Sequence, residues 1–432
     1  CLRCRPERAP ATAPANPIVE RAMALIALGY AQDGPSLARR LGVGERHLRR
    51  LFTAHLGASP KQVAETRRHL LARQLVVETD LPLTDVALAA GFGSLRRFNH
   101  VFRTLYGQPP SQMRRRAVKT GGEQGFTLSL PFRPPYDWDG VIAVLGAHGI
   151  PGVEAVTPER YARLISLGGH YGTIAVSLGG TDALCLRVDF PKLAFLPEIV
   201  ARLRSLFDLV ADTARIEDQL ATDPGLAPWI AARPGMRVPG AWDPFECAVR
   251  VILGQQVTVA AGKRLAARLV ALYGKPVETG IPGLTGLFPS PERLVEVADR
   301  ISLDLNMPRA RAAAIVNLAR AQIENPDVLA PGGNPDEAVQ RLVAVPGIGP
   351  WTAQCIALFA LREPDAFPIQ DVGLQRVLGL SAKALAERSE IWRPWRAYAA
   401  IHLWLQALGA IPPGVVPRAG TEKEGIHDAL VA

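Results

Sequence analysis

The sequence of 432 residues lacks any apolar run long enough to cross a membrane, and no segment of it resembles a signal peptide. These two absences argue against an integral membrane protein and against a secreted one. We therefore expect a protein that works inside the cell, in the cytoplasm.

Cysteine is scarce, and the number of cysteines is odd. The five are Cys1, Cys4, Cys185, Cys247 and Cys355. An odd number in an intracellular protein argues against a disulfide framework. The last three lie in apolar patterns that are typical of inert core residues.

Cys1 and Cys4 form a Cys-x-x-Cys pair, and the sequence lacks a second such pair. A structural zinc ion normally takes four ligands in a tetrahedron, so this pair supplies at most half of a zinc site. The chain also begins at Cys rather than Met. We therefore expect a larger protein whose beginning is missing.

Positive charge is what the sequence has in excess. Its 49 Lys and Arg residues outnumber 40 Asp and Glu, which gives a net charge of +9. Such a balance fits a nucleic-acid partner without proving one. The excess is concentrated within residues 1–119, which are crowded with arginine. The length and the hydrophobic content of 48% predict about two or three domains with sizeable cores.

Two segments near the amino terminus, Ser36–Phe52 and Leu83–Phe102, have the pattern of helix-turn-helix units. In both, Ala and Leu space a first helix, Gly makes the turn, and arginines face outward from a second helix that would enter the major groove. We therefore predict DNA contacts from four arginines: Arg46, Arg49, Arg96 and Arg97. The alternative is an amphipathic helical bundle whose arginines are merely solvated.

The second unit resembles the DNA-binding domain of AraC-type transcription factors. The resemblance is carried by a Gly-Phe turn and by Phe98, Phe102, Gly107, Pro110 and Arg114, whose spacing and residue types agree over some 30 residues. It implies a sequence-specific regulatory domain over residues 18–119.

Farther along the chain, strand-like runs cover residues 126–132, 173–178 and 184–189, and the last two form a predicted hairpin around Gly179. Helical patterns follow from Pro197. The predicted fold class is mainly α with a small antiparallel α+β domain. The expected divisions are 1–17 (zinc-domain remnant and linker), 18–119 (helix-turn-helix), 126–240 (α+β domain), 241–413 (helical domain) and 414–432 (disordered tail).

A short turn with two glycines, Pro346-Gly-Ile-Gly349, separates helical patterns over 336–343 and 351–361. Glycines let the backbone approach a ligand, and free amides at a helix start bind anions such as a DNA phosphate. Gly347, Gly349 and Thr352 are therefore predicted DNA contacts. The segment resembles the helix-hairpin-helix of DNA glycosylases with a Gly-Pro-Asp element; the alternative is a tight connection without a ligand.

Residues 134–404 are similar to the 3-methyladenine DNA glycosylase II family of alkylation repair. The matching segments are Pro135–Trp138, Leu206–Leu209, Ala232–Gly240, Ile252–Gln255, Pro346–Gly349, Trp351–Ala353, Asp371 and Trp392–Tyr398 with His402 and Trp404. The resemblance implies a small sheet-and-helix domain ahead of two helical lobes, with the active site between the lobes.

Asp371 is the catalytic residue that this resemblance implies. A fixed carboxylate would stabilise the positive charge that develops on the sugar and could align or deprotonate water. The alternative is a simple helix N-cap. Related enzymes that also cut the strand place a Schiff-base lysine just after the hairpin, where this chain has Trp351. The resemblance therefore implies a monofunctional glycosylase, and Gln370 stands where the family often carries a second acid.

The lesion has to be flipped out of the duplex into a pocket. Trp404 matches the family's stacking tryptophan, and Trp351 is either a second pocket wall or a core residue. Cys355 and Val144 stand where the family carries aromatic residues. Gln256 occupies the position of the apolar wedge that fills the gap in the duplex.

In this family, backbone carbonyls of the hairpin hold a monovalent or similar cation, and the matching positions are Val343, Val345 and Gly347. The four-cysteine cluster of the iron–sulfur relatives is missing.

The amino terminus resembles the Ada-type methyl-phosphotriester repair regulators, in which the pair matching Cys1 and Cys4 supplies two of four zinc thiolates. We therefore expect Zn²⁺ in the full-length protein. The first hypothesis for function is a glycosylase that removes alkylated bases. The alternative is an alkylation-responsive regulator with an auxiliary glycosylase part. Double-stranded DNA, alkylated and operator, is the expected partner of a nucleoid-associated bacterial protein.

Overall fold

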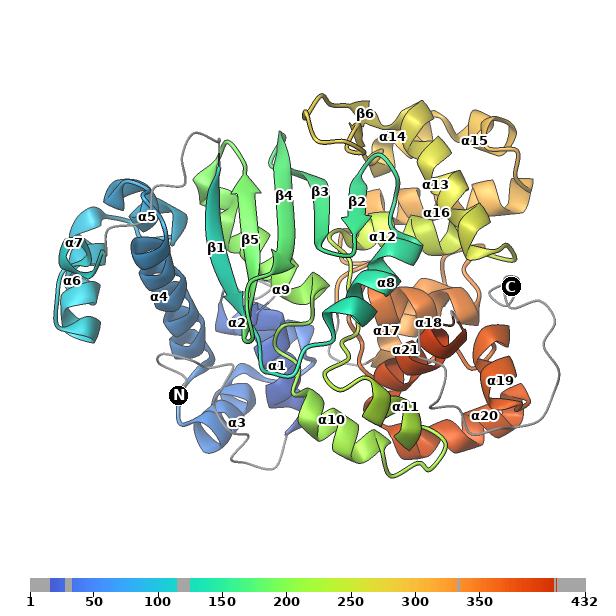
Figure 1. The fold of residues 1–432 in the computed structure, drawn as a ribbon, viewed down its shortest axis with the longest axis horizontal. Helices are drawn as coiled ribbons and strands as arrows, with labels where there is room; N and C mark the ends of the chain where they lie inside the picture. Colours follow the sequence, from blue (N-terminus) through green and yellow to red (C-terminus); the bar gives the residue numbers. More distant parts are fainter. Residues whose placement is uncertain (1–15, 28–32, 115–124, 332–334, 408, 410–432) are drawn as a thin grey trace. The chain divides into compact units, whose positions relative to one another are not determined.

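The computed structural model describes residues 16–27, 33–114, 125–331, 335–407 and 409 (Figure 1). Cys1, Cys4 and the expected tail from residue 414 lie outside these residues, so the zinc half-site and the tail stay predictions. The chain divides into two compact units. The first comprises residues 1–132 and 164–204, and the second comprises 133–163 and 205–432.

The first unit begins with helices whose ends are marked by the residues that the sequence places there. They are α1 (Pro17–Ala27), α2 (Gly34–Arg40), α3 (Glu45–Leu56), α4 (Pro60–Glu78), α5 (Leu83–Ala89), α6 (Leu95–Tyr106) and α7 (Pro110–Met113). Ser59 and Ser94 cap α4 and α6 with their side chains, and Gly57 and Gly107 end α3 and α6 in the left-handed conformation. The predicted helix-turn-helix units are thus α2–α3 and α5–α6.

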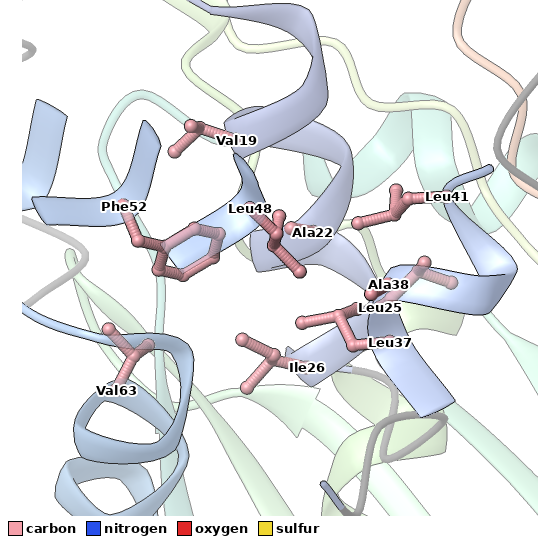
Figure 2. Packing of buried hydrophobic residues seen from close by; sticks show 10 residues of the cluster. All are labelled: Val19, Ala22, Leu25, Ile26, Leu37, Ala38, Leu41, Leu48, Phe52 and Val63. Carbon is pink, nitrogen blue, oxygen red and sulfur yellow. The ribbon is translucent and has the colours of Figure 1, made fainter. Parts of the chain in front are cut away.

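An apolar cluster holds α1 to α4 together, and Figure 2 shows its members converging from these helices. It consists of Val19, Ala22, Leu25, Ile26, Leu37, Ala38, Leu41, Leu48, Phe52 and Val63. Leu48 and Phe52, one turn apart on α3, are fully buried, so their apolar face fixes the rotation of this helix and leaves its opposite, arginine-bearing face in solvent.

The sheet is antiparallel in its assigned pairs, with the strand order β1-β5-β4-β3-β2. Its strands are β1 (Phe126–Pro131), β2 (Glu154–Thr157), β3 (Arg160–Leu167), β4 (His170–Leu178) and β5 (Ala183–Asp189). Leu128 lies opposite Leu186, and Leu186 lies opposite Val176, so buried side chains line up across three strands. The predicted fold class, mainly α with a small antiparallel sheet, is confirmed.

Strand β1 is at the edge of the sheet, and helix α4 covers it. The Ser129 backbone N–H donates to the Glu78 carboxylate at 2.7 Å. The Gln74 side-chain amide donates to the Ser129 carbonyl and, at 2.9 Å, to Glu78. Two side chains of one helix thus satisfy backbone groups that an edge strand otherwise leaves open.

The second unit is mainly helical, as predicted. Its helices include α8 (Trp138–His148), α10 (Thr213–Leu220), α11 (Ala227–Ala232), α12 (Pro244–Leu253), α13 (Val259–Tyr273), α14 (Pro291–Glu296), α15 (Ala298–Asp304), α16 (Arg309–Glu324), α17 (Pro335–Val343), α18 (Pro350–Phe359), α19 (Val372–Leu378), α20 (Ala382–Ser389) and α21 (Arg396–Ala407). Helix α9 (Leu196–Leu206) crosses from the first unit to the second, and short strands β6 (Lys275–Pro276) and β7 (Gly286–Leu287) pair with each other.

Candidate active site

Helices α17 and α18 and the turn between them form the predicted helix-hairpin-helix. Gly347 has a φ of 93°, and a Cβ atom there would lie 2.5 Å from the Ala314 Cβ atom of α16. Only glycine fits this backbone and this close approach. Asn317, also on α16, donates from its side-chain amide to the Pro346 carbonyl at 3.1 Å. The hairpin is therefore packed and hydrogen-bonded onto α16.

Gly349 is the N-cap of α18, and the cap has no side-chain hydrogen bond. Pro350 follows as the first residue of the helix and has no N–H group to donate. The helix start thus offers backbone amides without a competing side chain, which suits an anion. The side chain of Thr352 is buried, and its hydroxyl accepts a hydrogen bond from Gln255 at 2.9 Å. A contact between Thr352 and DNA remains a prediction, and it would have to use the backbone.

A cavity of about 120 Å³ is lined in part by α18, α21 and the start of α19. It brings together four of the predicted site residues. They are Asp371, Trp351, Trp404 and Cys355. These residues come from α18, α21 and the segment that precedes α19, so the cavity exists only in the folded unit.

The Asp371 carboxylate is buried, with 6% of the residue exposed, and three N–H groups donate to it. Its Oδ1 atom accepts from the Leu374 backbone at 3.0 Å and from Trp404 Nε1 at 3.2 Å. Its Oδ2 atom accepts from Trp351 Nε1 at 2.9 Å. Asp371 is thus the N-cap of α19, as one alternative held, and it also faces the cavity.

One wall of the cavity is aromatic. The rings of Trp404 and Phe359 are stacked, with centroids 5.7 Å apart and an interplanar angle of 17°. His148 lies against the same phenylalanine, with ring centroids 6.1 Å apart. Trp351 is half-buried and lines the cavity, so it is a pocket residue rather than only a core residue. Such a wall can stack on a flat heterocycle.

The cavity is also lined by three polar residues that sequence analysis did not single out. They are His148, Arg250 and Lys263. Arg250 donates to the His148 carbonyl at 2.9 Å, and Lys263 donates to the Gly146 carbonyl at 2.7 Å. Burial, and secondarily these two cations, lowers the pKa of His148 to about 3, so its imidazole is neutral near pH 7. Arg250 lies two residues before Ile252–Gln255, a segment that matches the glycosylase family. This match is the one sequence signal that lies close to these three residues.

Two other predicted pocket or wedge residues have different surroundings. Val144 is buried in α8 and is not among the residues that line the cavity. Gln256 is exposed in the turn after α12 and has a φ of 54°, a left-handed conformation that is uncommon for a residue other than glycine. Burial raises the pKa of the Cys355 thiol well above its usual value, and the nearby Asp371 acts in the same direction, so this thiol stays protonated.

The hairpin carbonyls that were predicted to hold a cation already have partners. The Val345 carbonyl accepts from the Ile348 N–H at 3.0 Å, and the Gly347 carbonyl accepts from Gln255 at 3.3 Å. A carbonyl oxygen has two lone pairs, so each of these two retains one for a cation. The cation at Val343, Val345 and Gly347 therefore stays a prediction.

The four predicted DNA-contacting arginines are exposed on the second helices of the two helix-turn-helix units. Arg46 and Arg49 lie on α3, and Arg96 and Arg97 lie on α6. This is the placement that a recognition helix requires. Among the described residues, no helix is long and apolar enough to span a membrane. Within the same residues, no group of three or more His, Cys, Asp or Glu side chains is placed to hold a metal.

Three family profiles match the chain in the order that the fold shows. A helix-turn-helix domain matches residues 37–116, an AlkA N-terminal domain matches residues 127–243, and the HhH-GPD superfamily of base excision DNA repair proteins matches residues 249–387. Together with the hairpin and the buried Asp371, these matches define a helix-hairpin-helix DNA glycosylase that carries an AraC-type helix-turn-helix domain.

Similarity to individual proteins narrows this class to a family. The chain is 40% identical, over 94% of its length and 84% of the relative, to the probable bifunctional transcriptional activator/DNA repair enzyme AlkA of Mycobacterium tuberculosis. It is 34% identical to DNA-3-methyladenine glycosylase 2 of Escherichia coli, over 64% of this chain and 96% of that one. The chain belongs to the AlkA family.

A solved structure shares the fold. The 3-methyladenine DNA glycosylase from Archaeoglobus fulgidus superimposes with a TM-score of 0.57 at 21% identity, over 64% of this chain and 97% of that one. At this level of identity the likeness concerns the fold alone.

Proposed function

We propose that this protein hydrolyses the N-glycosidic bond of alkylated purines such as 3-methyladenine in DNA and leaves an abasic site. The observation that supports the proposal is the buried, triply hydrogen-bonded Asp371 in an aromatic cavity that the second helix of the hairpin helps to line. The names of the relatives support the substrate class.

In the proposed reaction, the hairpin amides bind a phosphate and the flipped base enters the cavity. Positive charge develops on the deoxyribose as the bond to the base breaks, and the buried Asp371 carboxylate stabilises it. The same carboxylate orients the water that attacks the sugar. The base leaves with the bonding electrons, and alkylation makes it a better leaving group because the alkylated ring carries positive charge.

The pocket differs from the family's pattern in ways that bear on lesion range. Trp404 and Phe359 supply the stacking surface, whereas Cys355 stands where an aromatic residue is familiar. Arg250 and Lys263 add positive charge, which works against a cationic base. Trp351 takes the place of the Schiff-base lysine, which supports a monofunctional enzyme.

A second function, transcription regulation, is favoured by the match over residues 37–116 and by the exposed arginines on α3 and α6. Its proposed partner is operator DNA, read in the major groove. Because both proposed partners are DNA, the proposed site of action is the nucleoid in the bacterial cytoplasm. Zn²⁺ at Cys1 and Cys4 and a monovalent cation on the hairpin carbonyls are further proposals that await metal analysis.

The substitution Asp371→Asn tests the enzymatic proposal. Asn keeps the size of the side chain and can still cap α19, but it removes the negative charge. We expect the single-turnover rate of 3-methyladenine release to fall by about 10² or more, with DNA affinity nearly unchanged. The measurement is base release and binding on the same alkylated duplex. Near-normal turnover by the Asn variant would contradict the assignment.

A further inference from the structure

The two oxygen atoms of Asp371 are not equivalent. Oδ1 accepts two hydrogen bonds, from the Leu374 backbone and from Trp404, whereas Oδ2 accepts one, from Trp351. A carboxylate has about four acceptor positions, two on each oxygen. With the described residues as donors, Oδ1 is therefore filled, and a single position remains, on Oδ2.

We propose that Trp351 and Trp404 are positioning residues that hold this carboxylate through their indole N–H groups and direct the open position of Oδ2 at the reacting sugar. The proposal rests on the proposed catalytic role of Asp371. It assigns the two tryptophans a second role besides stacking on the base, and it identifies Oδ2 as the oxygen atom that faces the reacting sugar.

Three separate elements fix the carboxylate. Trp351 lies in the first turn of α18, Trp404 lies on α21, and the Leu374 N–H belongs to α19. Rotation of the carboxylate about its Cβ–Cγ bond would break all three hydrogen bonds together. Trp404 is itself held by its stack on Phe359. A donor that is held in place before the reaction stabilises charge without reorganising during it.

The same bonds limit what the two indoles can do to a base. An indole has one donor and no acceptor. Because Trp351 and Trp404 each give that donor to Asp371, they can contact the flipped base only through their rings. Polar recognition of the base is left to other residues of the cavity, among which the His148 side chain is neutral near pH 7 because burial lowers its pKa.

The test is Trp351→Phe in the full chain, which keeps a ring in the wall and removes the donor to Oδ2. We expect the single-turnover rate of 3-methyladenine release to fall about tenfold or more, as for loss of a hydrogen bond to a charged group, while the affinity for alkylated DNA stays within about twofold. A merely structural role would instead lower the melting temperature and leave the rate per folded molecule unchanged.

Trp404→Phe is the second variant, and it removes one of the two donors to Oδ1. Because Leu374 still binds that oxygen, we expect a smaller loss of rate than for Trp351→Phe. An equal or larger loss at Trp404, with DNA affinity unchanged, would overturn the assignment of Oδ2 as the reactive atom.

Combination with Asp371→Asn shows whether Trp351 acts through the carboxylate. If it does, Trp351→Phe should not reduce the residual rate of the Asn variant any further. The same loss in both backgrounds would overturn the positioning role while leaving the catalytic role of Asp371 intact. Full activity of Asp371→Asn alone would instead contradict the proposed function, so the two failures are distinguishable.

Trp392→Phe is the matched control. Trp392 also donates its indole N–H to a buried aspartate, Asp223, at 2.8 Å, but neither residue lines the cavity. The loss of this indole donor should lower the melting temperature without changing the rate per folded molecule. A fall of about tenfold in that rate in this control would overturn the proposal, since any lost indole–carboxylate bond would then produce the same effect.

Discussion

Asp371 shows how one residue can cap a helix and also serve the proposed reaction. As N-cap it binds the Leu374 N–H, and as cavity residue it keeps an acceptor position open. Sequence analysis treated a helix cap and a catalytic group as alternatives for Asp371. The two roles are compatible, because they use different lone pairs of the carboxylate. The capping bond also restrains the side chain. A carboxylate on a loop without such a bond would lack this restraint.

Two histidines, the buried His402 and the half-buried His148, should make stability depend on pH. Burial is the main cause that lowers the pKa of His148 to about 3 and that of His402 to about 4, against about 6.5 in an unfolded chain. Between these values the unfolded chain binds more protons. Their contribution to stability is therefore full above pH 6.5 and is lost as pH falls toward 4 and 3.

We expect His148→Gln and His402→Gln each to reduce the slope of unfolding free energy against pH, measured by urea unfolding between pH 6.5 and 5. The reduction should approach one proton, about 1.4 kcal/mol per pH unit. His100→Gln, at an exposed position of α6, is the control. Slopes that match the unsubstituted protein in both the His148 and the His402 variant would show that these histidines do not titrate on unfolding.

Residue types and family spacing could predict the members of the site but not every contact. Asp371, Trp351, Trp404 and Cys355 come together as predicted residues of one cavity. Lys263 escaped notice because a lysine on a helix is usually solvated, and only the packing of α13 against α8 brings it to the cavity. Side-chain direction depends on tertiary packing, which one sequence does not display.

At the scale of elements, the hairpin offers a matched pair of glycines. A methyl group at Gly347 would meet Ala314 at 2.5 Å on a left-handed backbone, whereas one at Gly349 would meet nothing within 4 Å. We expect Gly347→Ala to lose about 1–3 kcal/mol of stability and DNA affinity with it. Gly349→Ala should lose less stability, only that of a poorer N-cap, but should bind alkylated DNA more weakly, because the methyl group would crowd the predicted phosphate. Unchanged DNA binding by a folded Gly349→Ala protein would contradict the predicted phosphate site.

The recognition helices carry their own prediction. Replacing the four exposed arginines of α3 and α6 with Ala should weaken operator binding and flatten its dependence on salt, because fewer counterions are released. The residues are Arg46, Arg49, Arg96 and Arg97. Binding isotherms at several salt concentrations provide the measurement, and base release by the same protein is the control. A salt slope equal to that of the unsubstituted protein would count against these contacts.

Strands were harder to predict than helices, for a physical reason. Strands β1, β4 and β5 alternate between buried and less buried residues, and their runs were recognised with ends shifted by up to three residues. Strand β3 is buried without interruption from Tyr161 to Ile165, so it has no alternation to detect. The four residues of β2 are too few to form a pattern. Alternation reports a half-exposed strand, not strands in general.

At the scale of the whole molecule, repair and regulation should be separable in activity. A fragment of residues 120–432 contains the hairpin, Asp371 and the whole cavity. We expect it to release 3-methyladenine from DNA at a rate similar to that of the full chain, because the described residues that line the cavity all lie after residue 120. Circular dichroism would first establish that the fragment folds. A folded but inactive fragment would show that the two functions depend on each other.

The cover that α4 places over strand β1 constrains how this fused protein can diverge. Gln74 and Glu78 bind the backbone of Ser129 and not its side chain. Selection for these hydrogen bonds would therefore act on the residue types at positions 74 and 78, whereas the residue type at position 129 could vary. Related fused chains should accordingly retain an amide and an acid one turn apart at the end of this helix, whatever operator they read. Two residues of the helix-turn-helix domain would then be retained because they stabilise the edge strand of the sheet, and not because they bind DNA.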